Sequence, residues 1–310
     1  MKVLLLGATG FLGRRLARRF ESEGLAFVPV STSLGTDLRD HRQFRVVFER
    51  NPGLNVVVHA AAFVGGIKFG LDHSAEIFHN NTLLGVHLFE LAREFGIERI
   101  INPIANCSYP RDAFPEFREE LWWAGPLDES VLVYGLVRKA SYVQSVAYHR
   151  QYGLETINLL VPNMYGPEDH FEEIRSHALG ALVMKIVQAK RSGQPSVVIW
   201  GTGKPVREWL YVDDCVEAIL RSMTIPYHVE PINIGIGRGV SIEELAELIK
   251  REVGFTGTFE FDTSKPDGAP HKVMNIERCK NVFGWWPQTS LEEGIGRTVR
   301  WYLERVSDPR

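Results

Sequence analysis

Cysteine is scarce in this chain of 310 residues: only Cys107, Cys215 and Cys279 occur, and they lie far apart. An odd, scattered set builds neither a disulfide framework nor a metal cluster, and it is typical of a reducing compartment. The ten histidines show no metal-ligand spacing, so we predict no metal site. Charge of one sign is also lacking. A net charge of −3 supplies no broad basic field, which disfavours nucleic acid as the main partner.

Long apolar runs are missing as well. The run at residues 3–6 is too short for an export signal or a membrane span, and glycines interrupt it at once. We therefore expect a cytoplasmic protein with no membrane partner. An apolar share of 45% and a charged share of 24% are ordinary for a globular protein.

A glycine pattern follows that short run directly. Gly7, Gly10 and Gly13 come after residues 3–6, and residues 16–20 continue with helical periodicity. The first glycine of such a turn permits a tight bend, the second lets backbone approach a pyrophosphate, and the third lets the helix pack closely. The helix N-terminus adds free N–H groups and the positive end of a dipole. The pattern predicts a dinucleotide-binding turn.

Short apolar runs alternate with helical stretches through the first half of the chain. The predicted strands are residues 26–30, 55–59, 99–102 and 156–161, and residues 80–93 are one of the predicted helices. Such alternation predicts an α/β fold, a doubly wound parallel sheet covered on both faces. Ligands of these folds bind beyond the carboxyl ends of the strands.

The regular alternation of strands and helices becomes weaker after about residue 161. We expect turns at 162–167, helices at 178–191 and 241–250 and from about 291, short strands at 196–200 and 232–236, and a helix opened by the stretch 207–219. Ser241 and Glu244 form a capping signature. Residues 1–164 with about 207–237 are predicted to form a dinucleotide-binding Rossmann domain. Residues from about 165 to 206 with 238–310 are predicted to form a smaller α/β nucleotide-sugar domain.

Several motifs, in order over almost the whole length, resemble those of extended short-chain dehydrogenase/reductases, and more narrowly of the GDP-L-fucose synthases. They are HAAAFVGGI (59–67), NCSYP (106–110), a helix around Tyr134, RQYG (150–153), PNMYGPEDHF (162–171), SHA (176–178), VIWGTGKPVREWLYVDD (198–214) and SKPDGAPHK (264–272). The resemblance implies an epimerase–reductase acting on a nucleotide-linked 4-keto sugar.

The resemblance places Tyr134 at the family's catalytic tyrosine, which donates a proton to the sugar oxygen as hydride arrives. The family has a lysine four residues later that lowers the phenol pKa; here that position is Arg138, and Lys139 follows it. Arginine keeps the charge but presents a wider planar fork. The family's serine, four residues before the tyrosine of NCSYP, is Ala105 here. Its neighbours Asn106 and Ser108 are candidate substitutes, although strand alternation directs a neighbour elsewhere.

The family's epimerisation pair is present as Cys107 and His177. Inversion beside a ketone needs a base on one face and an acid on the other, and thiol and imidazole both titrate near neutrality. The catalytic residues implied are thus Tyr134, Arg138, Cys107 and His177.

The resemblance also implies binding residues. For the cofactor these are Gly7, Gly10, Phe11, Gly13, Asp37, Leu38, Ala60, Ala61, Tyr134, Arg138, Pro162 and Met164. For the substrate, a GDP-sugar or similar nucleotide-sugar, they are Asn163, His177, Lys185, Trp200, Arg207 and Lys272.

The sequence favours NADP(H) as cofactor, with NAD(H) as the alternative. No acidic residue stands at 30–33, the end of the second strand, to repel a 2′-phosphate. Yet Thr9 and Ser33 occupy the places of the arginines that the fucose synthases use there, which leaves Arg14 or Arg39 to compensate.

Three functions stay open: a 4-keto hexose or heptose epimerase/reductase, a keto-sugar epimerase or isomerase without net reduction, and a nucleotide-binding pseudoenzyme. The helices expected at 76–93 and 131–149 both show apolar faces. In the superfamily the corresponding helices pair across a two-fold axis, so a homodimer is implied.

Overall fold

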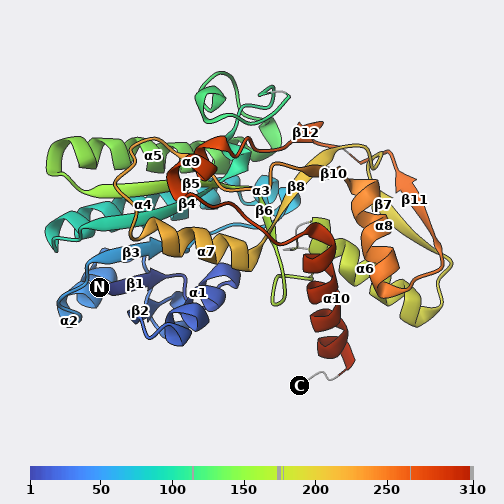
Figure 1. The fold of residues 1–310 in the computed structure, drawn as a ribbon, viewed down its shortest axis with the longest axis horizontal. Coiled ribbons are helices and arrows are strands. Elements are labelled where there is room, and N and C mark those ends of the chain that lie inside the picture. The colour runs from blue at the N-terminus through green and yellow to red at the C-terminus, as the bar shows by residue number, and fades with distance from the viewer. Residues whose placement is uncertain (114, 173–175, 177, 266, 308–310) are drawn as a thin grey trace.

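A parallel sheet of six strands forms the centre of the larger of two lobes (Figure 1). The computed structural model describes residues 1–113, 115–172, 176, 178–265 and 267–307. The strand order is β2-β1-β3-β4-β5-β9, and every neighbouring pair is parallel. The strands are β1 (Lys2–Leu6), β2 (Ala26–Val30), β3 (Val56–His59), β4 (Arg99–Ala105), β5 (Glu155–Val161) and β9 (Ile232–Asn233).

Helices cover both faces of this sheet, which explains why β1 is apolar at consecutive positions. Val3 and Leu5 pack with α1, α7 and α9, whereas Leu4 and Leu6 pack with α2 and α4 on the opposite face. The helices are α1 (Phe11–Ser22), α2 (His41–Arg50), α3 (Ile67–Asp72), α4 (Ser74–Glu94), α5 (Leu132–Tyr152), α7 (Val212–Ser222) and α9 (Glu277–Phe283). The fold is therefore the doubly wound α/β type that the sequence predicts.

The smaller lobe contains three helices, α6 (Ala178–Ser192), α8 (Ile242–Val253) and α10 (Leu291–Ser307) (Figure 1). Apolar residues of these helices and of strands in the same lobe form a separate buried cluster. Strand β8 (Val206–Tyr211) pairs with β6 (Asn163–Tyr165), β10 (Gly239–Ser241) and β12 (His271–Lys272). Strands β7 (Ser196–Trp200) and β11 (Thr258–Asp262) form a parallel pair. The exact extents of the two predicted domains stay a prediction.

Three local expectations were wrong. The stretch 207–219 begins as strand β8, and helix α7 starts only at Val212, with Asp213 and Asp214 in its first turn. The segment 162–167 contains strand β6. The strand expected at 232–236 is only two residues long. In the first two cases the reason is the same: pairing between distant segments extends chain that local turn and helix signals do not mark as strand.

The capping signature at Ser241 and Glu244 is confirmed. Ser241 accepts from the Glu244 N–H at 3.0 Å, and the Glu244 carboxylate accepts from the Ser241 N–H at 2.7 Å, which completes a capping box on α8. None of the helices in the described part of the chain combines the length and apolarity that crossing a bilayer requires.

Candidate active site

The glycine turn joins β1 to α1 and admits no side chain at two of its three glycines. Gly7 has φ +79°, and a Cβ there would lie 2.6 Å from the Ala60 carbonyl oxygen. A Cβ on Gly13 would lie 2.0 Å from the carbonyl oxygen of Gly7. Backbone from β1, the residues after β3 and the start of α1 therefore meet without intervening side chains.

This turn lies at the point where the strand order of the sheet reverses. The chain passes from β1 to β2 on one side and then crosses to β3 on the other side of β1. In open parallel sheets this reversal, at the carboxyl ends of the strands, is where ligands bind. Gly10 is the N-cap of α1 and supplies no side-chain cap, so the first N–H groups of the helix remain for a ligand. Phe11 begins that helix. The cradle fits a dinucleotide, with Ala60 and Ala61 on its far side.

The next predicted cofactor residues lie after β2. Leu38 is buried, and its carbonyl oxygen lies 3.3 Å from His87 Nδ1. The Asp37 carboxylate accepts from Arg39 Nε at 2.8 Å and Nη2 at 2.7 Å, and this lowers the pKa of Asp37. Arg39 also donates to Asn80 at 3.0 Å.

Arg14 is held just as firmly. It donates to the Thr9 carbonyl oxygen at 2.9 Å and to the Glu168 carbonyl oxygen at 2.9 Å, and its Nε lies 3.2 Å from the Glu168 carboxylate. Neither Arg14 nor Arg39 is therefore a free guanidinium, contrary to the expectation that one of them compensates for the missing arginines.

Tyr134 lies in the first turn of α5, and Arg138 follows on the same helix face. The Arg138 guanidinium carbon is 5.9 Å from the centroid of the Tyr134 ring. Its Nη2 donates to the Pro103 carbonyl oxygen on β4 and lies 3.5 Å from Asn102 Oδ1, while the buried Nε has no hydrogen-bond partner among the described residues. Burial raises the pKa of the Tyr134 phenol, and the charge of Arg138 opposes this rise. In the protein without its cofactor, the pKa of Tyr134 is therefore not lowered in the way expected of a catalytic tyrosine.

Lys139 points away from this face. Its Nζ donates to the Trp122 carbonyl oxygen and lies 4.5 Å from the centroid of the Trp123 ring, and burial lowers its pKa. The residue following Arg138 is therefore a packed lysine between indoles and does not replace the family's lysine.

Ala105 ends β4 where the family has its serine. Ser108 does not substitute for it, because its hydroxyl donates to the Ala105 carbonyl oxygen at 2.7 Å and accepts from Trp122 Nε1 at 2.9 Å. Asn106 is 5% exposed, and its Nδ2 has no hydrogen-bond partner among the described residues. The position lacks a hydroxyl that is free to meet a sugar oxygen.

Cys107 lies in the turn after β4, packed against α5 so closely that a Cβ on Gly135 would be 3.0 Å from the Cys107 carbonyl oxygen. Burial raises the pKa of its thiol, and the positive charges of Lys272 and Arg138 oppose this rise. The thiol also raises the pKa of Tyr134 electrostatically. The structure thus brings Cys107, Tyr134, Arg138 and Lys272 together, but burial shifts the pKa of the thiol upward, whereas the sequence predicts a pKa near neutrality.

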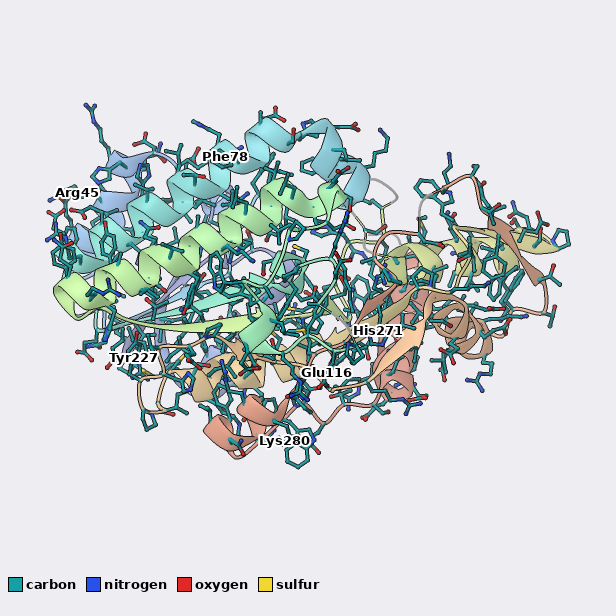
Figure 2. All side chains as sticks on the ribbon, turned by 90° about the horizontal axis from the view of Figure 1, so that it is seen from above. Arg45, Phe78, Glu116, Tyr227, His271 and Lys280 are labelled. Atoms are coloured by element: carbon teal, nitrogen blue, oxygen red, sulfur yellow. The ribbon has the colours of Figure 1, made fainter. Side chains whose placement is uncertain are left out.

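Lys272 and Arg207 are register partners on β12 and β8. The Arg207 guanidinium donates to the carbonyl oxygens of Val206 at 2.9 Å and Asp267 at 3.2 Å. Figure 2 shows His271, the neighbour of Lys272, where the two lobes meet. Lys272 and Arg207 are thus neighbouring cations, and Lys272 interacts electrostatically with Cys107, an arrangement suited to a diphosphate.

The remaining predicted substrate residues divide into two groups. Asn163 starts β6 directly after Pro162, with Met164 next, and pairs in register with Trp209 on β8. Trp200 is 53% exposed at the end of β7, with Lys185 Nζ 5.3 Å and Lys265 Nζ 5.7 Å from its ring centroid. His177 lies outside the described residues.

A model of the NAD dependent epimerase/dehydratase family matches residues 3–235. The chain belongs to this family. It is 35% identical to "Probable GDP-L-fucose synthase 1" of Oryza sativa subsp. japonica, over 98% of this chain and 93% of the relative. It superposes with TM-score 0.89 on a GDP-L-fucose synthetase from Naegleria fowleri bound to NADP, at 27% identity, over 99% and 93% of the two chains. A GDP-6-OMe-4-keto-L-xylo-heptose reductase from C. jejuni shares the fold with TM-score 0.92, at 24% identity over 98% of both chains.

Two residues near the candidate site were not singled out from the sequence. His59, at the end of β3, is buried beside Arg138, and burial together with that positive charge lowers its pKa to about 3. Asp128 caps the turn before α5 and offsets the charges of Lys272 and Arg207. His59 is the first residue of the HAAA motif, and that motif is the sequence signal that marks it. Nothing local marks Asp128, because β12 reaches it only through the tertiary fold.

No group of three or more His, Cys, Asp or Glu side chains in the described part of the chain is arranged to hold a metal ion.

Proposed function

We propose that this protein is an NADP-dependent epimerase/reductase acting on a GDP-linked 4-keto hexose or heptose. The observation that carries the proposal is that Tyr134, Arg138 and Cys107 come together at the carboxyl end of β4, in the same parallel sheet as the glycine turn, with Lys272 close enough to Cys107 to interact electrostatically and paired in register with Arg207. The relatives support the substrate class, since they are named as GDP-sugar synthases and reductases.

The nicotinamide, when bound, supplies or accepts a hydride at the sugar carbonyl carbon. Tyr134 donates the proton to the sugar oxygen, and its raised pKa keeps the phenol protonated at neutral pH. Arg138 is the nearby positive charge that makes loss of this proton less costly. The phenol therefore acts as an acid. It becomes a phenolate only as its proton passes to the oxyanion that develops on the sugar.

Cys107 and His177 move protons at the carbons beside the ketone. Because burial raises the pKa of Cys107, we assign the thiol as the proton donor and His177 as the base on the other face. Lys272 and Arg207 bind the diphosphate, and Trp200 with Lys185 holds the base or ribose. The first 164 residues with about 207–237 bind the dinucleotide, and the other segments bind the nucleotide-sugar.

We further propose a homodimer formed by α4 and α5. The two helices lie side by side along one side of the larger lobe, with Phe78 labelled on α4 (Figure 2). Phe78 is 49% exposed, and α5 carries an exposed apolar stripe at helical spacing: Leu132, Leu136, Ala140, Val143 and Ala147. A second copy related by a two-fold axis covers this face with its own α4 and α5.

All three cysteines are free thiols, which supports a cytoplasmic location.

A second candidate function is epimerisation without net reduction. Ala105 favours it, because the hydroxyl that the family uses is absent and Ser108 is engaged elsewhere. Proton exchange at Cys107 requires no such hydroxyl.

One experiment separates these functions. In heavy water, proton NMR should show deuterium entering a GDP-linked 4-keto sugar at the carbons flanking the ketone, and Cys107→Ser should slow this by at least about a hundredfold. NADPH oxidation is followed in parallel by absorbance. Deuterium exchange without NADPH oxidation identifies an epimerase without net reduction. NADPH oxidation without deuterium exchange contradicts the roles assigned to Cys107 and His177. Absence of both with every 4-keto hexose and heptose tried identifies a pseudoenzyme.

A further inference from the structure

Three hydroxyl groups form a closed triangle at the carboxyl end of β2. Thr9 Oγ1 lies 3.0 Å from Ser31 Oγ and 2.7 Å from Ser33 Oγ, and the two serine oxygens are 3.1 Å apart. Thr9 belongs to the glycine turn, whereas the serines follow β2. Ser31 is 6% exposed and Ser33 is open to solvent. The triangle thus has one buried corner and one accessible corner.

The end of the second strand is where dinucleotide folds recognise the adenosine ribose. A carboxylate at this place accepts from the 2′-hydroxyl of NAD and repels the 2′-phosphate of NADP, while an arginine nearby binds that phosphate. The triangle contains neither group. Hydroxyls donate to phosphate oxygens, and they also exchange hydrogen bonds with a ribose hydroxyl.

The two guanidinium groups considered as replacements for the missing arginines, those of Arg14 and Arg39, are already engaged. Arg14 is held by the Thr9 carbonyl oxygen and by Glu168, and Arg18 shares the same carboxylate at 2.5 Å and 3.0 Å. Arg39 is held by both oxygens of Asp37. Releasing Arg39 toward a phosphate would leave Asp37 without its charge partner, and releasing Arg14 would give up its hydrogen bonds to the carbonyl oxygens of Thr9 and Glu168, which offsets the gain in each case.

We propose that Thr9, Ser31 and Ser33 form the ribose 2′ subsite, and that this subsite binds NADPH and NADH with similar affinity. The inference rests on the dinucleotide binding proposed above and concerns only the choice between the two cofactors. A neutral donor set contributes hydrogen bonds to either ribose but lacks the ionic attraction that makes the 2′-phosphate decisive.

Isothermal titration of the whole 310-residue chain with NADPH and with NADH tests the proposal without reference to turnover. The two dissociation constants should agree within about tenfold, and their ratio should change little between low salt and about 0.5 M salt because no ion pair forms. Thr9→Val, which removes one hydroxyl at similar volume, should weaken both cofactors by about three- to tenfold.

Ser33→Arg adds the missing cation at the accessible corner. It should tighten NADPH by about tenfold or more while NADH changes less than about threefold, and the matched variant Ser33→Gln, of similar length but neutral, should show no such gain. Thermal unfolding of each variant checks that the fold is kept.

The outcomes are distinguishable. A wild-type preference for NADPH of about a hundredfold that falls steeply with salt would overturn the inference and leave the proposed function intact. Equal NADPH affinity in Ser33→Arg and Ser33→Gln would overturn it as well, by placing the 2′ subsite elsewhere. If neither cofactor binds, the inference and the proposed function fail together.

Discussion

At the scale of single residues, the chemistry of this chain depends on two positions beside Tyr134. Ala105 supplies a methyl group where a hydroxyl is expected, and Arg138 supplies a positive charge anchored to β4. The charge remains close to the phenol, but the hydroxyl has no replacement in Ser108, whose donor and acceptor are both engaged. Reduction should therefore be slow for lack of a hydrogen bond rather than for lack of a charge.

Ala105→Ser tests this directly. A hydroxyl at the end of β4 adds one hydrogen bond to the developing oxyanion, so NADPH oxidation with a GDP-linked 4-keto sugar should rise by about tenfold, on the order of 1.4 kcal/mol. Ala105→Val is the control for bulk without a hydroxyl and should give no increase. A rise in both variants would indicate that side-chain volume, not hydrogen bonding, limits the step.

Arg138→Met tests the charge. Burial raises the pKa of Tyr134 and Arg138 opposes that rise, so removing the guanidinium should raise the pKa further. Since reduction needs the protonated phenol, activity falls as pH rises through this pKa. The alkaline limb of kcat should move to higher pH by about one unit in Arg138→Met and stay in place in Arg138→Lys. A limb that is the same in all three proteins would show that Tyr134 is not the titrating donor.

At the scale of elements, the β1–turn–α1 unit separates a packing glycine from a binding glycine. A Cβ on Gly13 would lie 2.0 Å from the Gly7 carbonyl oxygen, whereas one on Gly10 would lie 3.2 Å from the same atom. Gly10 is also in extended backbone, with φ −73° and ψ 173°, which other residues adopt readily.

Substitutions of Gly13 and Gly10 should consequently affect different properties of the protein. Gly13→Ala should lower the free energy of unfolding by about 1–3 kcal/mol, because helix and strand must separate. Gly10→Val should unfold within about 1 kcal/mol of wild type yet weaken dinucleotide binding by at least about tenfold, since its branched side chain occupies the approach of the pyrophosphate. Denaturant unfolding and titration calorimetry measure the two effects. Unchanged dinucleotide affinity in Gly10→Val would remove the assignment of this turn.

At the scale of the whole molecule, the exposed apolar face on α4 and α5 is the surface that we propose contacts a second copy of the chain. Val143 is 53% exposed and Leu136 is 48% exposed, both on the outer side of α5. Exposed apolar side chains are unremarkable singly, but a continuous stripe along a long helix marks an interface.

Light scattering at micromolar concentration should give about twice the chain mass of 35.1 kDa. Val143→Glu places a charge within the proposed interface and should give the monomer mass. Val229→Glu alters a valine that is 45% exposed outside these helices and should leave the dimer intact. A monomeric wild type would contradict the proposal.

The sequence by itself determined the parts of this protein that depend on neighbours along the chain. The buried run of β1, the glycine turn, the capping box of α8 and the i,i+4 pair Tyr134–Arg138 all follow from local periodicity and backbone geometry. The motifs that resemble the family added the candidate site, and the family itself is confirmed.

Only the tertiary structure decided which polar groups are free and which are engaged. Ser108 is bound to Trp122, Lys139 lies between indoles, and Arg39 is paired with Asp37. Strand β8 and the approach of Lys272 to Asp128 likewise arise from segments far apart in the chain. The physical reason is that hydrogen-bond partners and desolvation are set by which segments meet in space, and sequence periodicity describes only the segment itself.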